Sequence, residues 1–189
     1  MEQSKMIIVE GPQGTGKTTL ANYLRENMSG SNLYRLSGQK DKSMEGLKYS
    51  IKMYRALIDY LKTMQNIPMD MIFDRTFMTE EVYSRLGYKD YSFNLVYKEL
   101  KEELNNLRYE IYYFSLYLKN ISLFKERLER PSHHNYQEFS IENSINQQNT
   151  YIEIANELNV MDNINVYQIA MDDFGASYGK INKILKLEK

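Results

Sequence analysis

Short apolar runs alternate along the chain with longer segments whose apolar residues recur at helical spacing. The apolar runs predict strands at residues 6–9, 32–36, 69–73, 110–118 and 164–171. In the segment 43–64, Met53, Leu57, Leu61 and Met64 fall on one helical face, which predicts a long helix. Strands and helices that alternate in this way predict a parallel sheet with helices on both faces.

The segments between the strands predict the remaining helices and loops. Helices are expected at residues 17–28, 79–86, 90–107, 121–130, 140–159 and 176–187. Thr79 is expected to cap the helix that it begins. Pro131 ends the helix before it, and residues 131–139 are expected to form a polar loop or lid. The neighbouring His133 and His134 lack the spaced partners of a metal site.

The turn after the first strand carries a phosphate-binding motif. Gly11, Gly16, Lys17 and Thr18 fit G-x-x-x-x-G-K-[ST] between a predicted strand and a predicted helix. Glycines let the backbone point successive N–H groups inward, and the helix N-terminus adds partial positive charge. Lys17 is expected to reach the β- and γ-phosphates of ATP, and the Thr18 hydroxyl to bind Mg²⁺. The expected nucleotide contacts are Gly11, Gln13, Gly14, Thr15, Gly16, Lys17, Thr18 and Thr19.

The composition is that of an ordinary globular protein. The 189 residues are 42% hydrophobic and 26% charged, and the net charge of −1 argues against a broad nucleic-acid surface. Because the chain has no cysteine, disulfides and thiolate metal sites are excluded. No apolar run approaches the roughly 18 residues of a membrane span, and the N-terminus has no signal-peptide pattern. A cytoplasmic protein without a membrane or stable nucleic-acid partner is therefore expected.

Polar residues follow the first and third predicted strands. In an open α/β sheet ligands bind beyond the carboxyl ends of the strands, so Gln13 and the loop after Leu36 are expected to meet at one cleft. Asp74 belongs there and is expected to hold Mg²⁺ through water or take a proton from the acceptor, the alternative being a surface salt bridge. Arg75 suits a phosphate, because a guanidinium donates two parallel hydrogen bonds. Glu10 is expected either to act on magnesium or the acceptor, or only to brace the loop.

Three further arginines are candidates with simpler alternatives. Arg55 lies in the long helix, where a lone arginine normally belongs to a solvated face. Arg127 and Arg130, with Lys125, make a basic helix end, which the helix dipole alone would favour. They are equally suited to a lid that closes on ATP, with Glu138 to orient them.

With these residues in place, the chain resembles the thymidylate kinase and deoxynucleoside kinase group of P-loop kinases, and thymidylate kinases more closely. The resemblance covers nearly the whole chain. It is carried by IIVEGPQGTGKTTLANYLRE at the phosphate loop, IFDRTFMTEEVYS after the third strand, SLFKERLER with QEF at the lid, and YIEIA in the following helix. The chain is also similar to uncharacterised kinase-like proteins of phages and prophages.

The resemblance implies a role for each matching residue. Lys17 and Thr18 would hold ATP and magnesium. Arg75 would bind the 5′-phosphate of the acceptor, with Asp74 beside it. Arg55 falls near the second phosphate-binding arginine of the family, although its separation from Arg75 is shorter than is usual.

The lid and the base-reading positions follow the family less uniformly. Arg127 and Arg130 would act on the transferred phosphoryl group, and they are the natural source of positive charge because the loop carries Thr15 rather than an arginine. Gln13 stands where thymidylate kinases usually have an aspartate, and residues 35–38 only faintly resemble the glutamate-proline-glycine turn of the family. These departures put thymidine specificity in doubt and leave the kinase chemistry in place.

These features predict one P-loop NTPase domain of the α/β class over residues 1–189, with a five-stranded parallel sheet ordered 2-3-1-4-5 and a lid at about 125–139. The expected reaction transfers the γ-phosphoryl of MgATP to a nucleotide, most readily a deoxynucleoside monophosphate. A deoxynucleoside kinase is an alternative, and it would need Glu10 or Asp74 as a general base. The altered turn after Leu36 also permits a non-catalytic nucleotide-binding regulatory module. The base and the oligomeric state, a homodimer included, stay open.

Overall fold

The computed structural model describes residues 3–129 and 140–187. Five parallel strands form one sheet in the order β2-β3-β1-β4-β5, as predicted. Their bounds are β1 Lys5–Glu10, β2 Ser31–Arg35, β3 Asp70–Asp74, β4 Glu110–Tyr117 and β5 Ile164–Ala170. Because β1 lies between β3 and β4, the carboxyl ends of these three strands meet at the middle of one sheet edge.

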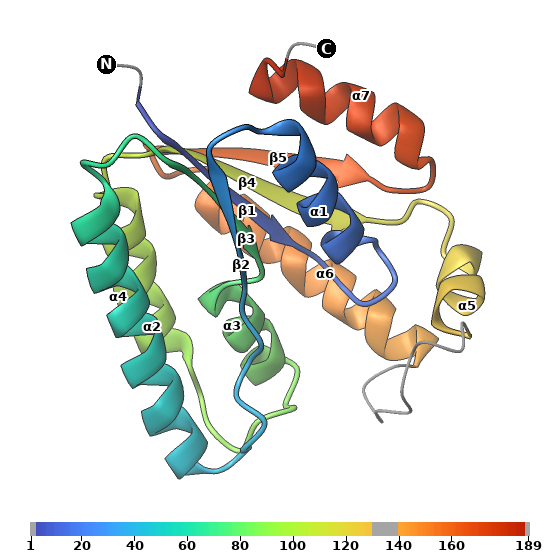
Figure 1. The fold of residues 1–189 in the computed structure, drawn as a ribbon. Helices are drawn as coiled ribbons and strands as arrows, with labels where there is room; N and C mark the ends of the chain where they lie inside the picture. The colour runs from blue at the N-terminus through green and yellow to red at the C-terminus, as the bar shows by residue number, and fades with distance from the viewer. Residues whose placement is uncertain (1–2, 130–139, 188–189) are drawn as a thin grey trace.

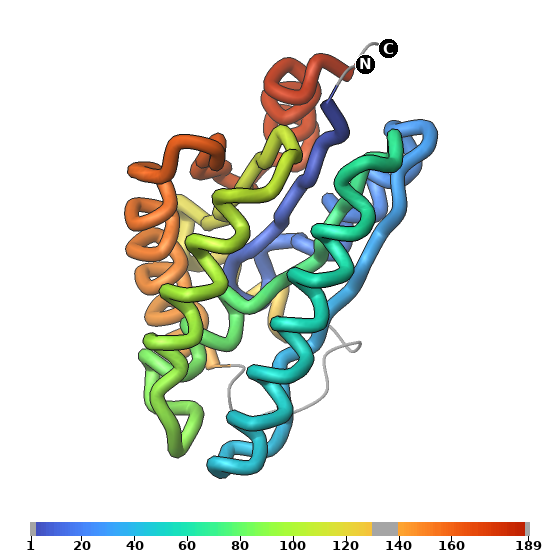
Figure 2. Tube along the Cα trace, turned by 90° about the vertical axis from the view of Figure 1, so that its left-hand side faces the viewer, coloured from blue at the N-terminus to red at the C-terminus, as the bar shows by residue number. Residues whose placement is uncertain are grey.

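Helices cover both faces of the sheet, as Figures 1 and 2 show. Their bounds are α1 Lys17–Asn27, α2 Met44–Met64, α3 Phe77–Arg85, α4 Asn94–Asn105, α5 Ser122–Leu128, α6 Ile141–Leu158 and α7 Phe174–Leu185. Helices α1 and α7 lie on one face, and α2, α3, α4 and α6 lie on the other. In the described part of the chain, no helix is long and apolar enough to cross a membrane.

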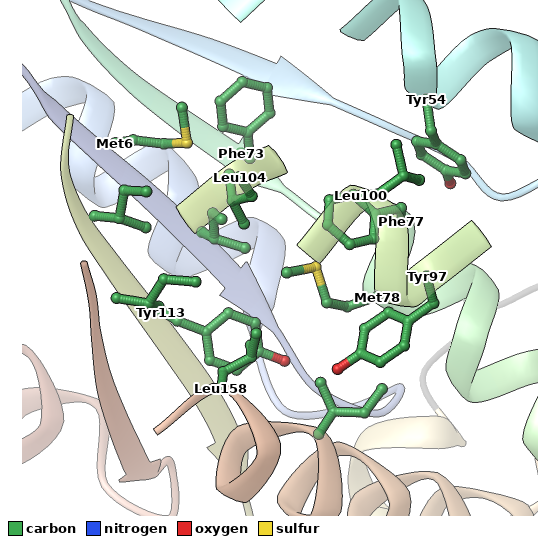
Figure 3. Packing of buried hydrophobic residues seen from close by; sticks show 14 of the residues in the cluster. Met6, Tyr54, Phe73, Phe77, Met78, Tyr97, Leu100, Leu104, Tyr113 and Leu158 are labelled. Carbon is green, nitrogen blue, oxygen red and sulfur yellow. The ribbon is translucent and has the colours of Figure 1, made fainter. Parts of the chain in front are cut away.

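The alternation of side chains along the strands divides the core into two layers. Met6 and Ile8 of β1 pack into the cluster under α2, α3, α4 and α6, whereas Ile7 and Val9 pack under α1 and α7. Figure 3 shows side chains of the larger cluster, in which Phe73 of β3 lies near Met6 of β1 and Leu104 of α4. Helices packed on both faces hold the strand ends rigidly at the edge where ligands would bind.

Three helices start two or more residues away from their predicted positions. Helix α7 begins at Phe174 rather than at residue 176. Helix α3 begins at Phe77, because the Thr76 hydroxyl accepts a hydrogen bond from the Met78 amide at 3.4 Å and acts as the cap. The predicted cap, Thr79, instead lies inside the helix with its hydroxyl turned into the core. Helix α4 begins at Asn94 rather than at residue 90, and residues 86–93 form a loop.

The core predicts a large effect of truncating Phe73. Phe73 is 1% exposed and its ring stacks on Tyr34 with the centroids 5.0 Å apart. Phe73→Ala should lower the free energy of unfolding by about 3–5 kcal/mol in urea denaturation followed by circular dichroism. Leu95→Ala is the control, since Leu95 is 81% exposed, and it should stay within about 0.5 kcal/mol of wild type. Equal losses in the two variants would contradict this core assignment.

Candidate active site

The phosphate loop connects β1 to α1, and its conformation depends on glycine. Gly11, Gly14 and Gly16 all have positive φ, at 148°, 80° and 84°. A Cβ on Gly11 would lie 2.6 Å from the Leu116 carbonyl oxygen of β4, so no larger residue fits without a backbone shift. The loop is closed internally by the Thr15 hydroxyl, which donates to the Pro12 carbonyl at 2.8 Å.

Lys17 is the first residue of α1 and lies under the loop. Its side chain is buried, and its Nζ donates to the Pro12 carbonyl at 2.7 Å. Burial, and to a smaller extent the nearby charge of Arg75, lower the pKa of Lys17 to about 7, although Asp74 and Glu10 act in the opposite direction. An anion in the loop would supply the counter-charge that this amine lacks.

Asp74, at the end of β3, and Thr18 form a pair suited to a divalent cation. The Thr18 hydroxyl donates to Asp74 Oδ2 at 2.7 Å, and Arg35 of β2 approaches the same oxygen at 3.9 Å. The other carboxylate oxygen, Asp74 Oδ1, is buried without a hydrogen-bond partner. A buried carboxylate oxygen with unused acceptor capacity beside a hydroxyl fits a hard cation such as Mg²⁺, so the two predicted ligands lie together.

Arg75 lies between two cavities. The first, of about 170 Å³, is lined by the phosphate loop and the start of α1 and includes Arg127 and Phe174. The second, of about 300 Å³, lies on the other side of Arg75. Its lining includes the loop after β2, the tyrosines Tyr83 and Tyr88, and Lys89. Gln13 and Arg75 line both cavities, so the structure brings these two predicted residues to the boundary between them.

The charge of Arg75 is stabilised by its surroundings. Burial opposes the charged form, but Tyr83, Tyr151, Asp74 and Glu10 together raise the pKa of Arg75 above its usual value. In the described part of the chain its guanidinium forms no hydrogen bond or ion pair to another residue. A guanidinium group with unused hydrogen-bond donors at the boundary of a cavity is suited to bind phosphate oxygens.

Glu10 braces the turn that follows β3. Its Oε1 accepts hydrogen bonds from the amide of Thr76 at 2.6 Å and from the Thr76 hydroxyl at 2.9 Å, and its Oε2 accepts one from the Thr79 hydroxyl at 2.7 Å. Tyr151 of α6 lies 2.9 Å from the same Thr79 oxygen. Burial raises the pKa of Glu10 to about 7, although these donors and Arg75 act in the opposite direction. Both carboxylate oxygens are engaged, so of the two roles expected for Glu10 the geometry favours the brace.

Arg127 contacts the phosphate loop directly. Its Nη1 donates to the Gly14 carbonyl at 3.1 Å, and its Nη2 donates to the Met171 carbonyl at 2.9 Å. The guanidinium carbon lies 4.9 Å from the centre of the Phe174 ring. Arg127 therefore joins α5 to the phosphate loop and to the turn after β5. Its expected partner, Arg130, lies outside the described residues, as does most of the predicted lid, residues 130–139.

Arg55 is not brought to the cleft. The resemblance put Arg55 near the second phosphate-binding arginine of the family, but Arg55 on α2 points toward α4, where its Nη2 donates to Glu99 at 2.8 Å. Its side chain is 52% exposed and lines neither of the two cavities. The solvated helix face is thus the arrangement that the structure shows, and a direct contact from Arg55 to an acceptor has no support in the geometry.

Several residues that line the two cavities were not predicted from the sequence. Tyr83, Tyr88 and Lys89 line the second cavity, and Phe174 covers Gly16 so closely that a Cβ there would lie 2.6 Å from the ring. A signal for Tyr83 existed, because it lies on the same face of α3 as Thr76 and Thr79, at spacings of three, four and seven residues. Lys89 follows α3 in a loop, where no periodicity points to its position.

The sheet order and the glycine loop ahead of α1 define the chain as a P-loop nucleotide-binding protein. A family model described as "ATPase family associated with various cellular activities (AAA)" matches residues 7–105, more than half of the 189-residue chain. The chain belongs to this family. No curated protein matches the sequence.

Solved structures with a similar fold include kinases of nucleotides and nucleosides and a nucleotide complex. Thymidylate kinase from Candida albicans has a TM-score of 0.60 at 14% identity, covering 99% of this chain and 94% of that one. Deoxyadenosine kinase from M. mycoides with bound dATP has a TM-score of 0.63 at 19% identity, covering 96% and 99%. The YorR protein from Bacillus subtilis, in complex with phosphorylated GDP, scores 0.64 at 18% identity, covering 96% and 95%. The predicted likeness to P-loop kinases is confirmed at the level of the fold.

The low pKa of Lys17 predicts that ATP binding takes up a proton. At pH 8 the amine is mostly neutral in the free protein, and phosphate oxygens raise its pKa, so about one proton should be taken up per ATP bound. At pH 6 Lys17 is already charged and contributes little uptake. Calorimetry in buffers of different ionisation enthalpy measures this number.

The control for the proton uptake is Lys17→Arg. An arginine is charged at both pH values, so this variant should show no extra uptake at pH 8. Uptake that is equal at pH 6 and pH 8, or that persists in the arginine variant, would show that Lys17 is not the group that titrates.

The free oxygen of Asp74 predicts that Asp74→Asn weakens the effect of magnesium on ATP binding. An amide keeps the shape of the side chain but loses the negative charge that a hard cation prefers. The ATP dissociation constant should be measured with Mg²⁺ and with EDTA. Wild type should bind more tightly with the metal, and the variant should lose most of that difference. An unchanged difference would place the cation elsewhere.

Proposed function

We propose that this chain is an ATP-dependent kinase that transfers the γ-phosphoryl group of MgATP to a nucleotide, with a deoxynucleoside monophosphate as the preferred acceptor. The observation that carries the proposal is the position of Arg75, a half-buried cation at the boundary of two cavities. One cavity contains the phosphate loop and suits the donor. The other would hold the acceptor, so that Arg75 contacts phosphate groups from both sides.

In this proposal the donor is held by the phosphate loop. The loop amides and Lys17 bind the β- and γ-phosphates, and Thr18 and Asp74 are the residues that would hold Mg²⁺. The ion, when bound, neutralises phosphate charge during transfer. Arg127 keeps the Gly14 carbonyl in place and so fixes the loop backbone, while a role of Arg130 on the transferred group stays a prediction. Positioning and charge neutralisation would supply most of the catalysis.

The geometry favours a monophosphate over a nucleoside as the acceptor. A nucleoside offers a 5′-hydroxyl, which needs a general base within hydrogen-bond reach. Glu10 has both oxygens engaged by Thr76 and Thr79, and Asp74 is paired with Thr18. Neither carboxylate lines the second cavity, whereas Arg75 does. A monophosphate needs no general base, because its own phosphate oxygen is the nucleophile. Its negative charge also complements the positive charge of Arg75.

The comparisons support the proposal through the fold. Structures of similar topology include thymidylate kinases from Candida albicans and Ehrlichia chaffeensis and deoxyadenosine kinase from M. mycoides. These proteins cover nearly the same length as this chain, which also supports one kinase domain over residues 1–189. The base of the acceptor is a separate matter, since Gln13 replaces the aspartate expected of thymidylate kinases.

The proposal is tested by steady-state kinetics with MgATP and paired deoxynucleosides and deoxynucleoside monophosphates. Arg75→Ala should lower kcat/KM for the best monophosphate by about tenfold or more, because a charge-assisted hydrogen bond contributes about 1.5–3 kcal/mol. Arg55→Ala is the matched control and should behave as wild type, because Arg55 is exposed and pairs with Glu99.

The other outcomes separate the alternatives. Turnover of nucleosides alone, with Arg75→Ala lowering kcat and leaving acceptor KM unchanged, would identify a deoxynucleoside kinase. ATP binding without transfer to any acceptor would identify a non-catalytic regulatory module. Equal kinetics of both arginine variants would remove Arg75 from the reaction.

A further inference from the structure

We propose that Glu80 and Lys89 form a buried clamp that fixes the wall of the second cavity and thereby sets the affinity for the acceptor. This inference rests on the proposed function, because the second cavity is where the acceptor would bind. Glu80 lies on α3, and Lys89 lies in the loop between α3 and α4. Neither residue would touch the reacting atoms, so both are positioning residues.

The clamp holds the backbone of a single residue, Gln39, in the loop after β2. Glu80 is fully buried and Lys89 is 8% exposed, and Lys89 Nζ lies 3.1 Å from Glu80 Oε1. Glu80 Oε2 accepts a hydrogen bond from the Gln39 amide at 3.1 Å, and Lys89 Nζ donates to the Gln39 carbonyl. Both polar backbone groups of Gln39 are therefore bound by the two members of the ion pair.

Two further contacts tie the loop after α3 to the same place. The Tyr91 hydroxyl donates to Glu80 Oε1 at 2.5 Å, and the Asp90 amide donates to the Lys42 carbonyl at 2.9 Å. The fit is tight at Gly38, where a Cβ would lie 3.0 Å from Glu80 Oε2 and would require a small shift of that carboxylate. The loop after β2 thus meets α3 and the loop that follows α3 at one buried carboxylate.

The ion pair of Glu80 and Lys89 lies at the wall of the second cavity and not in the middle of the hydrophobic core. Gln39 and Lys89 both line the second cavity. A buried ion pair seldom stabilises the fold more than well-packed apolar residues of similar volume would. What this pair adds is a fixed position for the Gln39 backbone. Moving that wall would change the contacts of an acceptor without touching the donor cavity.

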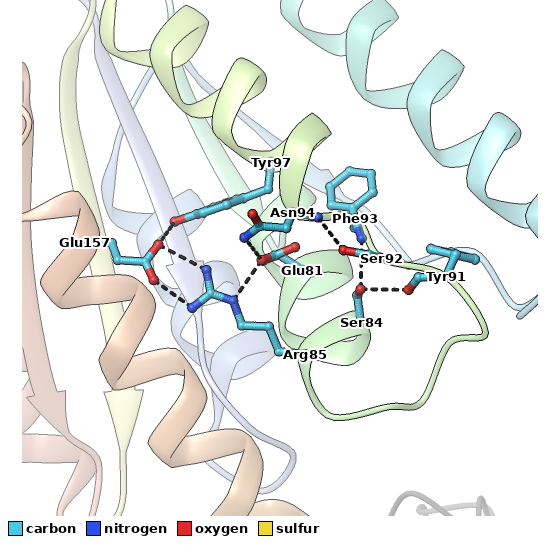
Figure 4. A network of polar contacts seen from close by, with 9 residues as sticks. All are labelled: Glu81, Ser84, Arg85, Tyr91, Ser92, Phe93, Asn94, Tyr97 and Glu157. Atoms are coloured by element: carbon cyan, nitrogen blue, oxygen red, sulfur yellow. Dashed lines mark hydrogen bonds and ion pairs between the residues drawn. The ribbon is translucent and has the colours of Figure 1, made fainter.

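The chain offers a matched control on the same helix. Arg85, also on α3, binds Glu81 at 2.8 Å and Glu157 of α6 at 2.7 Å, as Figure 4 shows. Glu81 is fully buried, like Glu80, but this network joins α3 to α6 and does not line the second cavity. Removing Arg85 therefore takes the ion-pair partner from a buried carboxylate one residue away from Glu80, while the cavity wall stays in place. That carboxylate keeps its hydrogen bond from Asn94.

The experiment compares the double variant Glu80→Gln with Lys89→Met against Arg85→Met. The double variant leaves no unpaired buried charge but loses the hydrogen bond from Lys89 to Gln39. We expect its acceptor KM to rise by about tenfold, with the ATP KM within about twofold of wild type. Arg85→Met should lower the melting temperature and leave both KM values unchanged. Tyr91→Phe, which changes no charge, should raise acceptor KM in the same direction by a smaller factor.

Hydrogen exchange separates failure of the clamp from failure of the proposed function. The Gln39 amide should exchange faster in the double variant than in wild type or Arg85→Met, whether or not a substrate is known. Unchanged exchange, or a wild-type acceptor KM in both the double variant and Tyr91→Phe, would overturn the clamp. A rise in acceptor KM in Arg85→Met equal to that in the double variant would also overturn it. Absence of turnover in wild type would instead overturn the proposed function. Hydrogen exchange of the Gln39 amide would still show whether Glu80 and Lys89 fix the Gln39 backbone.

Discussion

The arrangement of the cleft depends on one buried carboxylate, that of Glu10. It accepts two hydrogen bonds from Thr76, directly after Arg75 in the turn from β3 to α3, and one from Thr79 in the first turn of α3. Burial penalises the charged form of Glu10, and the three donors offset part of that cost. The end of β1 thereby fixes the turn that follows its neighbour β3, and with it the position of Arg75.

The hydrogen bonds of Glu10 help to hold Arg75 in a strained backbone conformation. Its φ of 74° is in the left-handed region, which for a residue with a Cβ costs on the order of 1–3 kcal/mol and persists only where the surroundings impose it. Its amide donates to the Val9 carbonyl at 3.2 Å, so the backbone on both sides of Arg75 is bound to the end of β1. The strained turn directs a guanidinium to the boundary of two cavities, where a relaxed continuation of β3 would not place it.

The sequence predicted the parts of the site that depend on local pattern. Lys17 and Thr18 follow from a motif whose glycines and helix start are local, and Asp74 follows from its place at the end of a buried strand. The cap at Thr76 was missed because Thr76 and Thr79 are equally suitable by composition, and only the tertiary contact with Glu10 draws Thr79 inward. The placement of Arg55 depends on how α2 packs against α4, which no local spacing encodes.

In the proposed function, the donor and the acceptor would be recognised by different kinds of contact in the two cavities. The cavity at the phosphate loop is lined by loop residues and by the cations Lys17, Arg75 and Arg127, a lining suited to phosphate charge and geometry. The second cavity is built from loops after β2 and α3, and its aromatic surface comes from Tyr83 and Tyr88, whose ring centres are 5.6 Å apart. Loops vary more readily than a sheet. Under the proposed function, a change of acceptor base would therefore be a change in these loops, and Arg75 and the phosphate loop would keep the same chemical role.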